Sequence, residues 1–342
     1  MKKILLITLL FIVTANITQA QTFKRDVSKK GTSAAPFLSI GQGAKAAGMG
    51  SAFVGVADDA SAIYWNPAGL ADLDGANLIF DHTEWFADIK YNFVAASYKL
   101  GDFGSIGFGF TSSDYGEMKE TTIDYPEGTG QTFTARDVVF SLAYAMKLND
   151  RFSIGFNPKI IYQSIWRMSA SSMAFDMGVK YITPFDDAIL AMSITNFGGK
   201  MQLLGTSNLV LYDENPSSTG NNGKIPAYIE TGEWALPLTF RVGVVYQPLR
   251  TELNKITIAV DALHPSDNYE SLNVGAEYIY DNLVSLRAGY KSLFLTDSEE
   301  GLTLGIGLRQ SLVGSVALLV DYAYQDFGRL SNIQKISFGI NF

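Results

Sequence analysis

Residues 332–342 read NIQKISFGINF and close the chain. Apolar side chains occupy every second position of this stretch and alternate with polar residues or glycine; the apolar set is Ile336, Phe338, Ile340 and Phe342, and the opposite set is Lys335, Ser337, Gly339 and Asn341. Alternation with a period of two places the two sets on opposite faces of a β-strand. The stretch therefore predicts a strand with one apolar and one polar face.

The same alternation recurs upstream, broken by turn residues. It predicts fourteen strands, at about 76–85, 89–100, 103–112, 134–148, 151–165, 171–183, 187–198, 236–247, 254–263, 271–280, 283–292, 301–311, 315–326 and 332–342. The faces of the first two are ambiguous. Each segment is near or above the roughly 9–11 residues that a tilted strand needs to cross a bilayer, whereas strands of soluble sandwiches are usually about 5–6 residues long. An all-β, antiparallel transmembrane barrel is therefore expected.

The connections favour the same architecture. Those after even-numbered strands are short, and the two longest, about 113–133 and 199–235, both follow odd-numbered strands. Bacterial outer-membrane barrels have short periplasmic turns and longer extracellular loops. This parity predicts a barrel over residues 76–342 in the outer membrane of a Gram-negative cell, with both termini in the periplasm. The terminal Phe342 resembles the aromatic that barrel-insertion machinery usually recognises.

The first residues carry the pattern of a targeting segment. Lys2 and Lys3 precede an apolar run over residues 4–13, and Thr18 and Ala20 precede Gln21. This pattern predicts a secretory signal peptide over residues 1–20. The apolar run is far shorter than the roughly 20 residues of a membrane-spanning helix.

Composition excludes several other classes. After removal of residues 1–20, 24 basic and 34 acidic residues leave a net charge of −10, which disfavours nucleic acid as a partner. The chain has no cysteine, so we expect no disulfide and no lipid anchor on an N-terminal cysteine. Hydrophobic residues nevertheless make up 47% of the chain, with 32 glycines, which fits a barrel surrounded by lipid.

Residues 41–73, GQGAKAAGMGSAFVGVADDASAIYWNPAGLADL, are too rich in Gly and Ala to bury much apolar side-chain area of their own. Either Asp58 or Asp59 can cap the segment that follows, and Asn66 with Pro67 fits a helix N-cap followed by proline. We expect residues 21–75 to form an N-terminal periplasmic segment and a small-helix plug in the lumen. The motif residues of this expected plug are Gly48, Gly50, Asp58, Asp59, Trp65, Asn66, Pro67 and Gly69.

Charges of both signs fall on the inward faces of neighbouring strands. The expected cross-strand partners are Arg241 with Asp261, Glu277 with Arg287, and Arg309 with Asp321. Opposite charges across adjacent strands stabilise the pair. These residues are either a structural ladder in the lumen or part of an ion or ligand path.

The sequence offers little for catalysis. The only histidines, His82 on an expected strand and His264 in an expected loop, lack a metal-ligand spacing such as HExxH. No GxSxG nucleophile motif is present, and Gly48, Gly50 and Gly55 are not followed by the Lys-Ser/Thr pair of a phosphate loop. We therefore expect no enzyme, no metal and no cofactor.

The connection 199–235 combines Gly, Asn, Ser and Pro with apolar residues that include Leu203, Leu211 and Trp234. It is expected to be either a surface loop folded over the barrel mouth or a lid or partner-binding element, since exposed apolar residues on loops favour recognition.

Residues 43–70, with the preceding PFLSIG at 36–41, resemble the N-terminal signature of the PorV/PorQ family of outer-membrane proteins. That family is related to the FadL-type transporters of hydrophobic compounds, whose N-terminal segment carries an ADDAS…NPAG-like pattern and whose barrel has fourteen strands. Residues 57–61, ADDAS, and 66–69, NPAG, match that pattern.

The resemblance implies two functions. PorV/PorQ-like proteins are accessory barrels of the type IX secretion system of Bacteroidota, where they receive secreted cargo from the translocon or help to attach it. FadL-like proteins instead pass fatty acids or other hydrophobic molecules, with the N-terminal segment as a hatch. The run GMGSAF favours the secretion accessory, and the FadL-like channel is the alternative. A structural barrel that docks partner proteins is the third possibility.

Overall fold

A computed structural model describes residues 29–217, 224–312 and 316–342. The expected signal peptide, residues 1–20, lies outside the described residues. None of the helices in these described ranges is long and apolar enough to cross a membrane.

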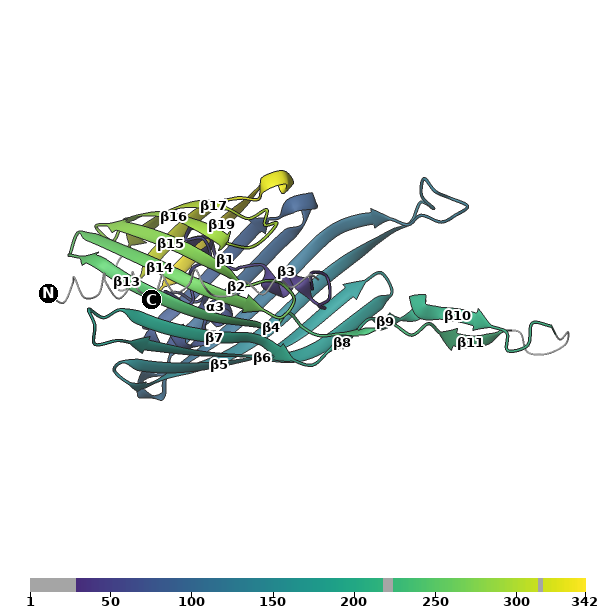
Figure 1. Ribbon diagram of the computed structural model, residues 1–342, viewed down its shortest axis with the longest axis horizontal. Helices are drawn as coiled ribbons and strands as arrows, with labels where there is room; N and C mark the ends of the chain where they lie inside the picture. Colours follow the sequence, from purple (N-terminus) through teal and green to yellow (C-terminus); the bar gives the residue numbers. More distant parts are fainter. Residues whose placement is uncertain (1–28, 218–223, 313–315) are drawn as a thin grey trace, which may run out of the picture.

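The chain forms a closed antiparallel β-barrel of fourteen strands (Figure 1). Strands adjacent in sequence pair with each other, β7 pairs with β13 across the insertion between them, and the first and last strands close the ring through pairs such as Phe80 with Phe338. The fourteen strands are β1 (Ala76–Glu84), β2 (Lys90–Lys99), β3 (Ser105–Lys119), β4 (Thr132–Asn149), β5 (Phe152–Ile165), β6 (Met168–Ile182), β7 (Ile189–Gly198), β13 (Thr239–Arg250), β14 (Asn254–Pro265), β15 (Ser271–Tyr280), β16 (Val284–Leu293), β17 (Leu302–Ser311), β18 (Ala317–Asp326) and β19 (Asn332–Asn341).

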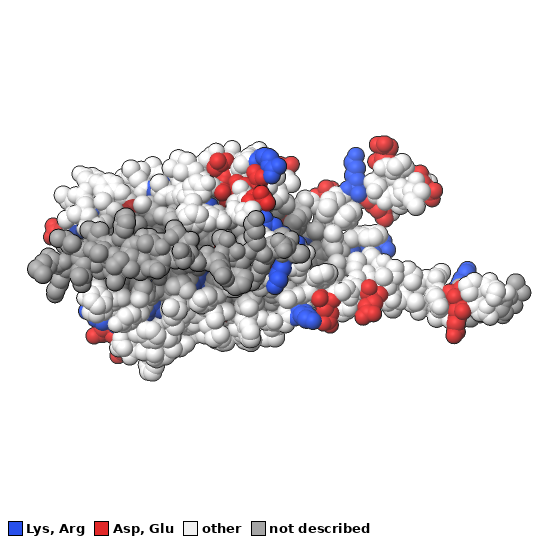
Figure 2. Space-filling model, in the orientation of Figure 1, with Lys and Arg blue, Asp and Glu red and all other residues white. Residues whose placement is uncertain are grey.

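The barrel confirms the fold class and the number of strands expected from the alternation. Outward-facing Phe80 is 41% exposed, and its neighbours Ile79 and Asp81, which face the lumen, are 5% and 0% exposed. On the face drawn in Figure 2, charged side chains are sparse over the barrel wall and more frequent towards the end that carries the long loops. An apolar outer wall around a polar interior is the arrangement of an outer-membrane barrel.

The ribbon formed by β3 and β4 is longer than the alternation predicted. Strands β3 and β4 continue beyond the barrel to Lys119 and from Thr132, so the expected 113–133 loop shortens to 120–131. The register shifts between Asp114 and Glu117, where the ribbon leaves the wall. Most side chains of this ribbon beyond residue 116 are exposed or half-buried. Because this part of the ribbon has no face in lipid, its sequence does not alternate between apolar and polar residues.

The insertion between β7 and β13 contains short elements: β8 (Met201–Gln202), β9 (Leu204–Gly205), η5 (Thr206–Asn208), β10 (Leu209–Tyr212), β11 (Ile225–Tyr228) and β12 (Glu233–Trp234). Strand β9 adds to the end of β6, and β8 pairs with β12. Strands β10 and β11 form a hairpin that projects far beyond the barrel (Figure 1). At its base, the insertion therefore extends the barrel wall through β9. Further out, β10 and β11 form a hairpin that pairs with no barrel strand.

The remaining helices are short. Those that precede the barrel are η1 (Pro36–Ser39), α2 (Ala44–Gly48), α3 (Ala62–Trp65) and η2 (Pro67–Asp72), and those in the strand connections are η3 (Phe86–Asp88), η4 (Gly101–Phe103) and η6 (Gly328–Leu330). The first four belong to residues 36–73, which fill the lumen and are called the plug below. The buried apolar residues of the barrel core are largely plug residues and the wall residues that they touch.

Candidate functional site: the plugged lumen and its mouth pocket

The plug and its flanking residues, 34–75, run through the barrel from one end to the other. The backbone N–H of Ala34 donates to the carbonyl of Ala235, 2.8 Å away, at the end with the long loops. At the opposite end, the carbonyl of Gly75 accepts from Lys99, beside the C-terminal Phe342. Of the segment 21–75, expected to begin in the periplasm, the described residues 34–38 form hydrogen bonds and apolar contacts at the long-loop mouth.

Close backbone contacts explain the glycines of the plug. A Cβ at Gly48 would lie 2.9 Å from the Cα of Gly305, and one at Gly50, which has a φ of +63°, would lie 2.6 Å from the carbonyl oxygen of Val274. The wall also provides glycines, since a Cβ at Gly275 would lie 2.2 Å from the carbonyl oxygen of Met49. The plug and the wall therefore meet backbone to backbone, which glycine alone permits without displacement.

The Trp65-Asn66-Pro67 turn is buried against β5 and β6. Asn66 caps η2 by accepting from the N–H of Ala68 at 3.1 Å, with Pro67 next in sequence as the NP pair predicted. The Asn66 amide donates to the carbonyls of Val54 and Val179, 3.0 and 3.1 Å away, which joins the plug to the wall.

Trp65 and Gly69 lie on either side of this turn. The Trp65 indole donates to the carbonyl of Gln42 at 2.8 Å, and its side chain is 2% exposed. Gly69 lies where a Cβ would be 2.3 Å from the carbonyl oxygen of Ala57. Full burial of a large apolar side chain stabilises a fold by roughly 1.5–3 kcal/mol, so Trp65 is a principal anchor of the plug.

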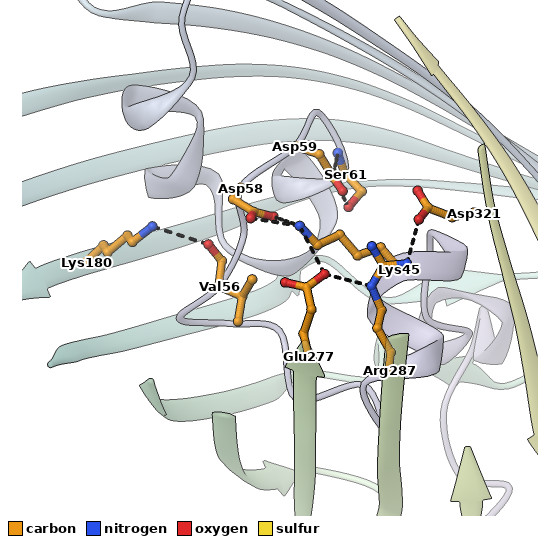
Figure 3. Close-up of polar contacts among 9 residues, drawn as sticks. All are labelled: Lys45, Val56, Asp58, Asp59, Ser61, Lys180, Glu277, Arg287 and Asp321. Atoms are coloured by element: carbon orange, nitrogen blue, oxygen red, sulfur yellow. Dashed lines mark hydrogen bonds and ion pairs between the residues drawn. The ribbon is translucent and has the colours of Figure 1, made fainter. Parts of the chain in front are cut away.

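An ionic network holds the other side of the plug (Figure 3). The Lys45 ammonium lies 2.8 Å from the Asp58 carboxylate and 3.8 Å from Glu277 on β15. Glu277 accepts from Arg287 on β16 at 2.8 Å, and Arg287 reaches Asp321 on β18 at 2.5 Å. Lys45 therefore connects the plug to a chain of charges on three wall strands, which we call the latch.

Asp59 does not cap a helix as expected, and neither does Asp58. Helix α3 has no side-chain cap, and Asp59 instead accepts from the backbone N–H and the hydroxyl of Ser61, at 2.8 and 2.5 Å. Burial, followed by repulsion from Asp58, raises the pKa of Asp59 to about 6. Asp58 instead pairs with Lys45, so the two adjacent carboxylates of the ADDAS motif bind different partners.

Two of the expected pairs in the lumen are wrong. Arg309 is exposed and lies opposite Leu319, and Asp321 binds Arg287 instead. The side chain of Arg287 crosses above Gly307, where a Cβ would be 2.8 Å from its Nη1. Because the intervening strand has no side chain at this position, the ion pair spans two strands rather than one.

Arg241 and Asp261 also find partners in the plug rather than each other. Asp261 accepts from the backbone N–H groups of Phe53 and Val54, at 2.7 and 2.9 Å. The Arg241 guanidinium lies 5.8 and 5.6 Å from the ring centroids of Tyr64 and Trp65. Cations are attracted to aromatic faces at such distances. Of the three expected pairs, Glu277 with Arg287 is the one that forms.

An apolar cavity opens at the long-loop end, directly above the start of the plug. It has a volume of about 680 Å³ and is called the mouth pocket below. Its lining is Ala34, Ala35, Pro36, Tyr115, Met118, Ala135, Asp137, Gln163, Ser164, Ile165, Ala170, Met201, Leu203, Thr231, Gly232 and Trp234. This size lies within the roughly 300–1,000 Å³ of small-molecule sites, which are typically apolar with a few placed polar groups.

The plug forms the floor of the mouth pocket. Phe37 and Leu38 are buried among Tyr91, Val139 and Ile161 of the wall. Below them, a second cavity between the plug and the wall has a volume of about 20 Å³. That is room for about one water molecule and too little for an organic ligand. An organic molecule in the mouth pocket therefore cannot descend along this path unless residues 36–39 move.

Most residues that form the mouth pocket could not be identified from the sequence. Tyr115 and Asp137 lie on parts of β3 and β4 near the barrel rim, and Gln163 lies near the end of β5. Their spacing in sequence carries no motif, because the barrel register alone brings them together, as with Ser113 opposite Asp137. The Leu203 and Trp234 side chains, singled out in the 199–235 connection, do line the pocket.

The remaining expectations concern chemistry. His82 lies on β1, 2.7 Å from Asn92, and His264 lies on β14 rather than in a loop, 3.0 Å from Glu270. The described residues contain no group of three or more His, Asp or Glu side chains placed to hold a metal ion.

The fold and the site define a class: a fourteen-stranded outer-membrane β-barrel with an N-terminal plug. Residues 29–183, somewhat less than half of the chain, match the family described as outer membrane protein transport protein (OMPP1/FadL/TodX). A comparison with curated proteins gave no match.

Solved structures share the barrel at low sequence identity. The Ralstonia pickettii toluene transporter TbuX is 13% identical with a TM-score of 0.55, over 88% of this chain and 97% of that one. The CymD monoaromatic hydrocarbon channel is 14% identical with a TM-score of 0.54, over 88% and 98%. A Pseudomonas aeruginosa FadL homologue is 14% identical with a TM-score of 0.51, over 86% and 97%. These structures show a shared fold, and the family match is limited to residues 29–183; a specific PorV/PorQ relationship is not shown.

Proposed function

We propose that this protein is a non-enzymatic, plug-gated channel for hydrophobic small molecules in the outer membrane. The observation that carries the proposal is the apolar mouth pocket of about 680 Å³, floored by the plug at the end with the long loops. The family match over residues 29–183 and the barrel shared with hydrocarbon transporters support it. In this proposal the long loops face outside, and Ala76 and Phe342 face the periplasm.

The geometry suggests how such a channel works. An apolar solute leaves water for the mouth pocket, which releases about 25 cal/mol for each Å² of apolar surface buried. Residues 36–39 then block descent, so transport requires displacement of η1. The polar latch and the Asp261 contacts lie further along the plug and hold the rest of it in place.

Binding to purified protein tests the proposal. N-phenyl-1-naphthylamine, an uncharged apolar fluorophore, is expected to bind saturably, and Leu203→Glu is expected to weaken binding at least tenfold. Leu211→Glu is the matched control, because Leu211 is 65% exposed on the projecting hairpin and does not line the pocket. Heat-dependent gel mobility checks that each variant is folded. Absence of saturable binding, or an equal loss in both variants, would contradict the proposal.

A type IX secretion accessory, or more generally a barrel that docks partner proteins, is the second candidate. The β10–β11 hairpin favours it, because Leu211, Tyr212 and Tyr228 are 65%, 55% and 70% exposed, and exposed apolar patches mark interaction sites. Recovery of translocon components or secreted cargo in pull-downs from native membranes, with hydrocarbon uptake unaffected by deletion of the protein, would favour this function over the channel.

A further inference from the structure

Among the lining residues that the structure describes, the mouth pocket contains a single formally charged side chain, and that side chain is acidic. Asp137 is 4% exposed, and these described lining residues include no Lys, Arg or His. The other polar groups are neutral: Tyr115, Gln163, Ser164 and Thr231. The described lining therefore offers no cation to neutralise an anionic ligand.

Hydrogen bonds from three neighbouring side chains hold the Asp137 carboxylate in place. The Gln163 amide donates to its Oδ1 at 2.9 Å, the Ser113 hydroxyl donates to its Oδ2 at 3.1 Å, and the Tyr115 hydroxyl donates to the same oxygen. The orientation of the Gln163 amide is set independently, because its Oε1 accepts from the N–H of Ala35 at 3.1 Å. An ionised carboxylate offers acceptor sites only, and these neighbours match that form.

We propose that Asp137 is a specificity-determining residue, through which the mouth pocket accepts uncharged apolar molecules and rejects carboxylates such as fatty-acid anions. The inference rests on the proposed function. A ligand carboxylate in this pocket would lose its hydration without gaining a cationic partner. It would also be repelled by Asp137: two unit charges about 7 Å apart in a medium of effective dielectric constant about 20 weaken binding by one to two orders of magnitude.

The same arrangement indicates which neutral ligands bind best. A hydroxyl or other weak donor at one end of an apolar molecule can hydrogen-bond to the Asp137 carboxylate or the Tyr115 oxygen, while the apolar body contacts Met118, Ile165 and Leu203. Uncharged hydrocarbons, phenols and alcohols are therefore the expected ligand class.

A matched pair of ligands tests the inference. Dodecanol and dodecanoate share one chain and differ at the head group, and dodecanoate is ionised at pH 8 because an ordinary carboxyl titrates near pH 4. Each is used to displace N-phenyl-1-naphthylamine from the full-length protein. We expect dodecanol to bind at least tenfold more tightly than dodecanoate, and Asp137→Asn to reduce that ratio about tenfold.

Asp114→Asn is the control for a loss of one negative charge. Asp114 lies on β3 beside Ser113, the partner of Asp137, but its side chain is exposed on the other face of the ribbon. The ratio is expected to stay at the wild-type value in this variant. Leu203→Lys provides a gain-of-binding test in a protein that keeps Asp137. The cation that it adds to the lining is expected to strengthen dodecanoate binding at least tenfold.

The outcomes separate the two proposals. If the fluorophore binds and wild-type protein prefers dodecanoate or binds both ligands equally, the selectivity inference is wrong and the channel proposal stands. If Asp137→Asn is folded and keeps the full preference, Asp137 does not determine it. If neither the fluorophore nor dodecanol binds, the proposed function itself fails.

Discussion

Replacement of Lys45 by methionine is expected to loosen the plug. In the latch, the Lys45 ammonium makes two contacts of 2.8 Å with the Asp58 carboxylate and one of 3.8 Å with Glu277. Methionine keeps most of the aliphatic stem that packs in the lumen but removes the charge. Glu277 retains Arg287 at 2.8 Å, so Asp58 is the carboxylate that loses its nearest cation.

The magnitude follows from burial. A hydrogen bond to a charged group contributes about 1.5–3 kcal/mol, and an exposed ion pair about 0–1 kcal/mol. The Lys45 side chain is 13% exposed and that of Asp58 is 40% exposed, so water can partly replace the lost contact. A loss of about 1–2 kcal/mol is expected, which corresponds to a five- to thirtyfold larger population of released plug.

A single cysteine can report this population, because the protein has none of its own. Ser51 is 4% exposed in the plug and close in size to cysteine, so Ser51→Cys is the parent variant. When plug opening and closing are fast relative to labelling, the rate of maleimide labelling is proportional to the released population. We expect Lys45→Met to accelerate labelling about five- to thirtyfold at constant pH.

Lys291→Met is the matched control. Lys291 forms a comparably buried pair with Glu300, 2.6 Å apart, without any plug residue. Its labelling rate is expected to equal that of the parent. Equal labelling of Lys45→Met and the parent would refute the reasoning that the latch holds the plug, whereas acceleration in both variants would show a general loosening of the barrel.

Three further predictions concern the plug. Because the raised pKa of Asp59 favours its protonated form in the docked plug, the plug is expected to dock more tightly as the pH falls from about 6 to 4, with little change above pH 6. Asp59→Asn should remove this pH dependence of Ser51→Cys protection. The labelling rate at each pH is divided by that of the urea-unfolded variant, because the thiolate is the reactive form of cysteine. Gly275→Ala is expected to speed cysteine labelling more than Gly301→Ala does, because its new Cβ would lie 2.2 Å from the Met49 carbonyl oxygen and the Gly301 Cβ would lie 3.7 Å from its nearest neighbour. Deletion of residues 43–70 is expected to raise the permeability of proteoliposomes to small solutes, and unchanged swelling rates with correctly folded barrel would show that the segment does not occlude the lumen.

Much of the barrel was predictable because its physical cause is local. Alternation of residues such as Phe338 and Gly339 places one face in lipid and the other in the lumen, and this pattern needs no knowledge of distant residues. The Asn66-Pro67 cap is equally local. The extension of β3 and β4 was missed since the ribbon leaves the wall at Asp114, where no apolar face is needed.

The partners of the charged residues were not predictable in the same way. Arg309 and Asp321 lie two residues apart in register, and the glycine at 307 lets Arg287 reach across a strand. Asp261 and Arg241 bind plug residues some two hundred positions away in sequence. Such contacts depend on how the plug threads the lumen, which strand periodicity does not encode.

A fourteen-stranded barrel and a Gly/Ala-rich segment without a core of its own follow from the order of residues along the chain, because strand periodicity and side-chain volume are properties of neighbouring residues. Three features depend instead on the folded barrel: the segment begins at the long-loop mouth, Lys45 lies beside Glu277, and Asp137 lies in an apolar pocket whose described lining includes no cation. Closure of the barrel brings residues from distant strands to one depth of the lumen. Their ion pairs and hydrogen bonds form only because of that closure, so they cannot be inferred from neighbouring residues in the sequence.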